Sequence, residues 1–288
     1  MDGYTALHET AAWLDLSGRG KIRVTGEDRA RLLHALLTND VQGLQPGQSN
    51  YHFFLNAQGR IQADLNLYVW GDHILLDCEP ETTERIYQTL DHYIIADDVQ
   101  LEDVTGRLAT VAVEGPRAEE LAGAGARGSR TGQPGIWFFV DPAEKPALIG
   151  RLEGAGVVAA TAEEARAVRV ENGAPQYGVD FGDTTLAQET QQLRALCFTK
   201  GCYLGQEIVE RIRSRGQVHR LLVRVAIEGS EPPASGAPVV AGGQEVGRLT
   251  SPVYSPRLGK ALGLAIVRRD FAAPGTVVTV DDRPGQVW

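Results

Sequence analysis

The residue whose surroundings are best suited to chemistry is Cys202, which lies just before a predicted helix over residues 204–213. A thiol near the N-terminus of a helix meets the positive end of the helix dipole, which favours the thiolate. Lys200 brings a positive charge two residues away, and Gly201 and Gly205 allow backbone or ligand to approach closely. These features indicate a reactive or metal-ligating cysteine, whereas the alternative is a small buried hydrophobic residue.

The other two cysteines have different surroundings. Cys197 follows the apolar residues Ala195 and Leu196, and Cys78 ends a predicted strand, so both are expected to be structural. The chain has no CxxC pair, which disfavours a self-contained zinc or iron–sulfur site. Three cysteines without paired spacing are typical of free thiols in a reducing compartment, so a cytoplasmic location is expected.

A carboxylate and a group of cations complete the set of candidate residues. Asp64 lies on the polar side of an alternating segment, residues 61–69, which predicts a strand that directs Asp64 into a channel or into water. Arg211 belongs to a basic cluster and has helical i,i+4 spacing to Glu207. The cluster predicts either surface ion pairs or an anion site, and its members are Arg211, Arg213, Arg215, His219, Arg220 and Arg224.

Composition disfavours two kinds of partner. The chain of 288 residues has a net charge of -9, and an acidic protein is not expected to bind nucleic acid directly, because phosphate contacts dominate such affinity. No apolar run approaches the roughly 20 residues that span a bilayer. The N-terminal residues show no basic stretch followed by an apolar one, so neither membrane insertion nor secretion is expected.

The hydrophobic patterns predict helices interleaved with antiparallel strands, which is typical of the α+β class. From about Val218 the pattern changes to short strands between Gly and Pro turns, which predicts a small all-β barrel or sandwich. The other expected elements are a helix over 25–38 capped by Thr25, strands over 51–55, 61–69 and 73–78, a helix from Pro80, a second unit from Arg107, a loop over 122–135, and a helix after the capping box Thr161–Glu164.

The segment Lys200–Glu207, Lys-Gly-Cys-Tyr-Leu-Gly-Gln-Glu, is similar to the signature of the YgfZ-type family. That family comprises folate-binding relatives of the glycine-cleavage T-protein that support iron–sulfur cluster assembly or maintenance, with tRNA modification among the processes supported. The resemblance extends over nearly the whole chain, at residues 37–41, 56–65, 169–180, 247–251 and 261–263.

The resemblance implies a three-domain cloverleaf around a central folate channel. The first α+β domain would be discontinuous, formed by residues 1–106 and 166–217. Residues 107–165 would form a second α+β domain, and residues 218–288 a C-terminal β-barrel.

The resemblance also assigns roles to residues. Tetrahydrofolate or a derivative would lie in the channel with its pterin ring toward Glu171, since a carboxylate can accept two parallel N–H bonds from the amino-pyrimidine edge. Arg169, Tyr177 and Asp64 would border the folate, and Arg211 would meet its glutamate tail. Cys202, assisted by Lys200, would act as the reactive thiol and as a transient ligand of an iron–sulfur cluster shared with an assembly protein or client enzyme.

One departure from the T-protein pattern bears on activity. The T-protein has adjacent acidic residues on the strand that carries Asp64, whereas this chain has Ala63 before Asp64. Three classes of function therefore remain: a folate-dependent cluster-assembly factor that is not a conventional turnover enzyme, a folate-dependent aminomethyltransferase, and a folate-binding module without chemistry. The Cys202 segment favours the first class, and the missing carboxylate weighs against the second.

Overall fold

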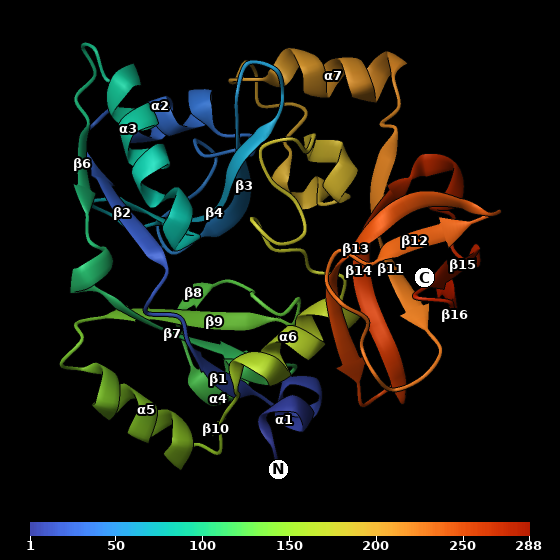
Figure 1. Cartoon of the computed structure of the whole chain (residues 1–288). Coiled ribbons are helices and arrows are strands. Elements are labelled where there is room, and N and C mark those ends of the chain that lie inside the picture. The colour runs from blue at the N-terminus through green and yellow to red at the C-terminus, as the bar shows by residue number, and fades with distance from the viewer.

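The structure is a computed structural model that describes all residues from 1 to 288 and arranges them in three units (Figure 1). The first unit contains a five-stranded sheet in the order β3-β4-β5-β2-β6. Apolar residues of α2 and α3 pack on one face of this sheet and form its core. The elements are β2 (Gly20–Thr25), α2 (Arg29–Leu36), β3 (Ser49–Leu55), β4 (Ile61–Val69), β5 (Ile74–Cys78), η1 (Pro80–Thr82), α3 (Thr83–Tyr93), β6 (Gln100–Asp103) and η2 (Thr105–Arg107).

The second unit contains another five-stranded sheet, in the order β10-β1-β7-β9-β8. Helices α4 and α5 pack on one face, and α1 and α6 pack on the other. The expected first domain, 1–106, thus gives its first helix and strand to this unit, because β1 pairs with β7 and β10. The elements are α1 (Gly3–Glu9), β1 (Ala12–Asp15), β7 (Ala109–Glu114), α4 (Ala118–Ala122), β8 (Ala126–Arg127), β9 (Gly135–Val140), α5 (Lys145–Gly154), β10 (Val158–Ala159) and α6 (Ala162–Glu171).

The third unit is a closed six-stranded barrel in the order β11-β14-β13-β12-β15-β16, as the short C-terminal strands predict. Its interior is filled by small and β-branched residues such as Val225, Ala265 and Val280. The elements are β11 (Arg220–Ile227), β12 (Pro238–Ala241), β13 (Gln244–Ser255), β14 (Lys260–Arg268), η5 (Arg269–Phe271), β15 (Val277–Val280) and β16 (Arg283–Val287).

A mostly irregular segment, yellow in Figure 1, connects α6 to the barrel and returns to the first unit. Phe181, Leu196 and Tyr203 from this segment pack against Phe53 and Ile61 of the first sheet. The segment contains η3 (Ala187–Thr190), η4 (Leu193–Ala195) and α7 (Gln206–Arg215). None of the helices in the structure has the length and apolar character that crossing a bilayer requires.

Two predicted helix starts have different outcomes. The capping box is confirmed, because Thr161 Oγ1 accepts from the Glu164 backbone N–H at 3.2 Å and Glu164 accepts from the Thr161 N–H at 2.7 Å. The cap at Thr25 is wrong: Thr25 ends β2, and α2 begins after Asp28. The reason is Gly26, whose φ of 98° turns the chain out of the strand before the helix can begin.

The alternation in β4 also predicts only part of the packing. Ile61, Ala63 and Leu65 are buried in cores of the first unit, as expected. On the opposite face, Asp64 and Tyr68 are buried as well, because the second unit covers that face of the sheet. Burial of this polar face arises from packing between units, which a strand pattern does not encode.

Candidate functional site

A small cavity lies where the first two units meet the segment that follows α6, and Asp64 is at its wall. The cavity measures ≈ 30 Å³ and is lined by Arg19, Tyr51, Asp64, Asn66, Ser129, Arg130, Trp137, Ala174, Pro175 and Arg194. Tyr51 donates its hydroxyl hydrogen to Asp64 Oδ2 at 2.7 Å, whereas Asp64 Oδ1 is buried and has no hydrogen-bond partner. A carboxylate oxygen without a partner is costly in a buried position, so this atom marks a place for a donor from water or ligand.

The protonation of Asp64 is shifted by its surroundings. Burial raises the pKa of the Asp64 carboxyl to about 6, and the negative charge of Glu79 acts in the same direction. The hydrogen bond from Tyr51 opposes this shift. Asp64 can therefore exchange a proton near neutral pH, a property of groups that act as acids or bases.

Two arginines beside the cavity are already committed to other carboxylates. Arg19 donates to Asp77 at 2.8 Å and to Glu79 at 2.6 Å. Arg130, from the loop of the second unit, also pairs with Glu79 and so ties the first two units together. Asp64 lies near this network without a direct partner in it, which leaves its carboxyl available for a ligand.

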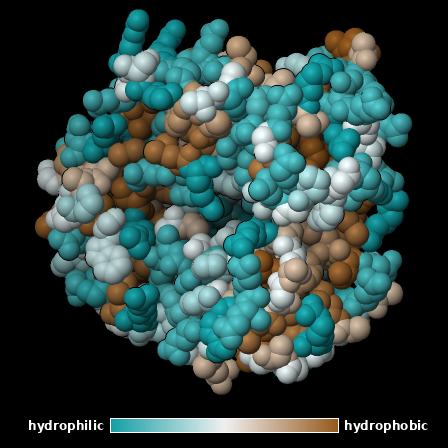
Figure 2. Space-filling view, turned by 180° about the vertical axis from the view of Figure 1, so that it is seen from behind, coloured by the Kyte–Doolittle hydropathy of each residue, from teal (hydrophilic) through white to brown (hydrophobic).

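A larger cleft adjoins the Asp64 cavity. It measures ≈ 610 Å³, lies between the second unit and the barrel, and shares Arg130 with the cavity. Its wall includes Trp13, Arg166, Arg169 and Thr250. The volume is within the range of small-molecule sites, so the cleft and the cavity together form one candidate binding region on the two sides of Arg130. Figure 2 shows the hydrophilic surface hollowed near the centre of the molecule.

Glu171 lies outside this region. Its carboxylate is buried and accepts hydrogen bonds from Tyr4 at 2.7 Å and from Ser255, and it pairs with His8 at 2.7 Å. Burial, together with the hydrogen bond to Glu171, raises the pKa of Tyr4 to about 12. The three partners come from α1 and β13, so the carboxylate holds the N-terminal helix and the barrel to α6.

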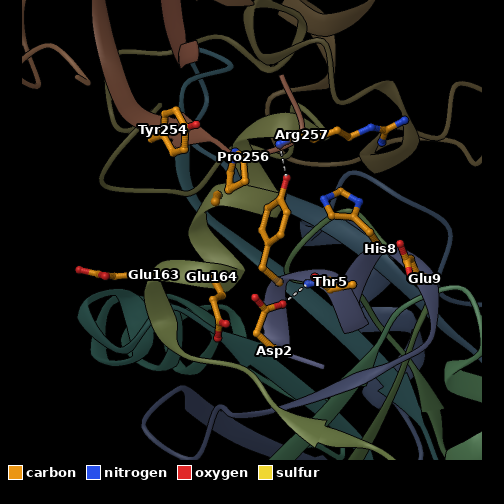
Figure 3. A pocket seen from close by; sticks show the side chains of 11 residues that line it. Asp2, Thr5, His8, Glu9, Glu163, Glu164, Tyr254, Pro256 and Arg257 are labelled. Atoms are coloured by element: carbon orange, nitrogen blue, oxygen red, sulfur yellow. Dashed lines mark hydrogen bonds between the residues drawn. The ribbon is translucent and has the colours of Figure 1, made fainter. Parts of the chain in front are cut away.

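Beyond Tyr4 and His8 lies a separate open pocket of ≈ 810 Å³, shown in Figure 3. Its lining is acidic, with Asp2, Glu9, Glu163 and others around the two rings. The backbone N–H of Arg257 donates to the Tyr4 hydroxyl at 3.1 Å, and Figure 3 shows His8 and Arg257 on neighbouring sides of the pocket. None of the residues expected to share a site with Glu171 lines this pocket.

The other expected folate residues are also separated. Arg169 is buried and donates to Asp180 at 2.6 Å and to Ser251 at 2.8 Å, while its α6 position borders the larger cleft. Tyr177 donates to Asp183 and accepts from Arg85 at 3.1 Å, away from both cavities. Arg169 belongs to α6 of the second unit, whereas Tyr177 belongs to the irregular segment that follows it (Figure 1). The structure thus brings Arg169 and Asp64 to the two sides of one region and leaves Glu171 and Tyr177 outside it.

Arg211 occupies an exposed position on α7 and lines neither cavity. The predicted ion pair between Glu207 and Arg211 is not formed, whereas Arg213 pairs with Glu210 at 3.5 Å. Arg224, from the same basic cluster, donates to the Glu171 carbonyl at 2.6 Å. The basic cluster is therefore not one site: Arg224 makes a structural contact, whereas Arg211 lies on an exposed face of α7.

Lys200 fixes the loop that contains Cys202. Its ammonium group donates to the carbonyls of Leu37 at 2.6 Å and Asn39 at 2.7 Å, just past the end of α2. Its own carbonyl oxygen is 2.9 Å from His34 Nε2. Burial lowers the pKa of Lys200 to about 8. Lys200 therefore directs its charge at carbonyl groups, where a cation is stabilised by the helix end, and not at the thiol.

Cys202 is the only exposed cysteine in the structure. Helix α7 begins at Gln206, with Gly205 as its N-cap, so Cys202 lies four residues before the helix and outside its first turn. Gly205 touches the β3–β4 turn so closely that a Cβ there would be 2.6 Å from the Asn56 carbonyl oxygen. Cys197 is half-buried, and burial raises the pKa of Cys78 to about 11.

The donor set does not fit a resident metal centre. No three His, Cys, Asp or Glu side chains in the structure are arranged to hold a metal ion. Protein-held iron–sulfur clusters typically need four protein ligands, and Cys202 is a single exposed thiol. Any cluster would therefore be cargo shared with another molecule.

The two α+β units, the closed barrel, and the cavity and cleft between them define a three-domain cloverleaf protein. Residues 2–139 match the GCVT N-terminal domain, and residues 220–287 match the glycine cleavage T-protein C-terminal barrel domain. The chain is 30% identical to an aminomethyltransferase of Rubrobacter xylanophilus, covering 98% of this chain and 82% of the relative. An aminomethyltransferase of Geobacillus kaustophilus is also 30% identical, over 97% and 85% of the two chains.

The fold is shared with a crystal structure of the glycine cleavage system aminomethyltransferase T from Bartonella henselae. The TM-score is 0.88 at 20% identity, over 99% of this chain and 87% of the other. This chain belongs to the glycine cleavage T-protein family. The predicted cloverleaf fold is confirmed, while membership of the YgfZ-type subgroup stays a prediction.

Sequence reasoning missed several residues at the cavity, among them Tyr51, Arg130 and Arg194. Tyr51 carried a usable signal: the β3–β4 register pairs Phe53 with Asp64, which makes Tyr51 a diagonal neighbour of Asp64. The arginines carried none, because loops that are distant in sequence bring them to the cavity.

Proposed function

We propose that this protein binds a reduced folate in the region on the two sides of Arg130 and uses the thiol of Cys202 to support assembly or maintenance of iron–sulfur clusters in client enzymes. The observation that carries the proposal is the position of Cys202: it is exposed, while the loop around it is fixed by Lys200 and Gly205. A thiol that is both accessible and held in place can act on another molecule, whereas a buried one cannot.

Folate binding is supported by the polar groups of the cavity. Asp64 offers an unsatisfied buried oxygen to an N–H donor, as a pterin ring would supply. The cavity of ≈ 30 Å³ is too small for a pterin, so the ligand would occupy the ≈ 610 Å³ cleft and reach Asp64 past a displaced Arg130 side chain. A role for Glu171 stays a prediction and requires the pterin to replace its protein donors.

The thiol and the cavity belong to one short segment. Arg194 lines the cavity, and Cys202 follows eight residues later along the same loop. The loop is bonded to the end of α2 at two further points, by the Cys197 N–H to Thr38 and by the Leu204 N–H to Ala35. A folate that displaces Arg194 would thus move the segment that carries the thiol. This movement links folate binding to the position of Cys202.

Aminomethyl transfer is the second candidate, and the relatives support it more directly than the first, because they are named aminomethyltransferases. Asp64, with its pKa of about 6, is the residue that would assist such a transfer at a folate nitrogen. Ala63 weighs against this candidate, since it is buried in the core of the sheet where the T-protein has a second acidic residue.

Titration calorimetry with tetrahydrofolate tests the binding part of the proposal. Wild type is expected to bind about one equivalent, and Asp64→Asn is expected to weaken binding by at least ~1 kcal/mol, the scale of a lost charge-assisted hydrogen bond. Glu171→Gln tests the separate prediction that the pterin replaces the protein donors of Glu171, and it weakens binding only if that replacement occurs. The exposed Asp72→Asn variant is the matched control. If Glu171→Gln binds folate as tightly as wild type, Glu171 is not part of the folate site. If Asp64→Asn binds folate as tightly as wild type, the Asp64 cavity is not part of that site.

A further inference from the structure

A cleft lined by basic residues is present at the rim of the barrel, far along the chain from Asp64. It measures ≈ 460 Å³ and is lined by Gln217, Val218, His219, Arg220, Arg268, Arg269 and Asp270. Arg220 and Arg268 are direct neighbours across the β11–β14 pair, so the two side chains leave the same face of the sheet. We call His219, Arg220, Arg268 and Arg269 the arginine cleft.

Two of the three arginines of the arginine cleft, Arg268 and Arg269, have no carboxylate partner, whereas Arg220 pairs with Glu189. The guanidinium groups of Arg268 and Arg269 make no hydrogen bond or ion pair, and Arg268 lies over the Phe271 ring at 5.0 Å. Arg220 approaches Glu189 at 3.3 Å, and Asp270 is the one acidic residue in the lining. The cleft therefore keeps a positive charge in a protein whose net charge is -9.

Helix α7 carries two further unpaired arginines, whereas its N-terminal half, nearer to Cys202, carries Glu207 and Glu210. Arg211 and Arg215 are exposed on its C-terminal half and, like Arg268 and Arg269, have no ion pair. Figure 1 shows α7 leading from the first unit down into β11, where the arginine cleft begins. The ten residues of α7 span about 15 Å, with the Cys202 loop before one end and the arginine cleft after the other.

We propose that the arginine cleft and the neighbouring arginines of α7 bind an acidic segment of a partner protein. Charge complementarity favours such an occupant, because several carboxylates along an extended chain match several unpaired guanidinium groups. Nucleic acid is disfavoured, since the surrounding surface of a protein with a charge of -9 repels a long polyanion. A partner held here lies alongside α7. The inference rests on the proposed function only in one respect, namely that the bound partner is a client placed within reach of Cys202.

The test uses a fluorescent octaglutamate peptide and the full-length protein. Arg268→Gln with Arg269→Gln is expected to weaken peptide binding about tenfold at low salt, because each removes a charge from a partly desolvated contact. The matched control is Arg107→Gln with Arg127→Gln, which removes the same charge from exposed arginines that already pair with glutamates. Binding is also expected to weaken as sodium chloride rises from about 50 to about 200 mM.

Three outcomes would overturn the proposal. One is an equal loss of binding in the control, which would show that net charge alone is responsible. Another is tighter binding of a single-stranded RNA of equal charge with the same sensitivity to Arg268 and Arg269. The third is a parallel loss of tetrahydrofolate affinity in the cleft variant, which would assign the cleft to the folate tail. Because peptide binding is measured without folate or client enzyme, its failure is distinct from failure of the proposed function.

Discussion

The carboxyl group of Asp64 has one donor, Tyr51, and one buried oxygen without a partner. Its pKa, raised to about 6, means that the folded state binds a proton more tightly than the unfolded state. Between about pH 4 and pH 6 the folded state therefore holds more protons, and the free energy of unfolding falls as pH rises through this window. Above it, the folded protein bears the whole cost of an ionised carboxylate in the cavity.

Asp64→Asn removes that cost. At about pH 7.5 the variant is expected to be more stable than wild type by up to ~3 kcal/mol, and the difference is expected to disappear toward about pH 4. The measurement is denaturant unfolding across this pH range. Asp183→Asn is the control and is expected to be less stable than wild type at neutral pH. Hydrogen bonds from Tyr177 and Arg85 outweigh desolvation and lower the pKa of Asp183, so its ionised form stabilises the folded state. A variant that is no more stable than wild type at neutral pH would contradict the burial of Asp64.

At the residue scale, the sequence could predict chemistry only where it is local. Cys202 could be singled out because its glycines and Lys200 adjoin it, and its exposure agrees with a reactive role. The interaction of Lys200 with Leu37 and Asn39 could not be predicted, because it joins residues more than 160 positions apart. The same holds for Glu171, whose three donors arrive from α1 and β13.

The element that positions the thiol is the loop between η4 and α7, and its glycines permit its path. Both Gly201 and Gly205 have positive φ, 96° and 82°. Only Gly205 is crowded, since its added Cβ would be 2.6 Å from the Asn56 carbonyl oxygen, whereas Gly201 has nothing within 4 Å. A substitution at Gly201 therefore tests the effect of backbone strain alone, whereas one at Gly205 tests strain together with a steric collision.

Gly205→Ala is expected to lower the free energy of unfolding by about 2–4 kcal/mol, and Gly201→Ala by about 1 kcal/mol, because only the first adds a collision to the strained φ. Urea unfolding of both variants measures the difference. If the two substitutions cost the same, the contact between α7 and the β3–β4 turn is looser than described, and the loop is not held by it.

At the element scale, periodicity and turn chemistry predicted most helices and strands. The strands of the barrel and the capping box at Thr161 follow from local patterns. β1 and the burial of Tyr68 could not be predicted, because each depends on which unit packs against it. The polar residues on one face of β4 indicate that this face lacks apolar side chains. They do not indicate whether another unit covers it.

At the scale of the whole molecule, the family fold is compatible with both candidate functions. The difference lies at the junction of the units, where Asp64 stands beside the buried Ala63. We therefore expect no methylene-tetrahydrofolate formation in a glycine-cleavage assay reconstituted with a lipoyl-linked carrier protein. An Ala63→Asp variant is the informative companion, although it places a charge in the core. Robust product formation by wild type would make aminomethyl transfer the better account.

The central claim is that Cys202 acts on clients outside this chain. Its most direct test is complementation of cells defective in iron–sulfur cluster maintenance, with cluster-enzyme activity as the readout. Wild type, Cys78→Ser and Cys197→Ser are predicted to restore the activity, because those two thiols are buried or half-buried. Cys202→Ser, once the purified variant is checked to be folded and to bind tetrahydrofolate, is predicted to fail. Full restoration by Cys202→Ser would contradict the account and leave a folate-binding protein without thiol chemistry.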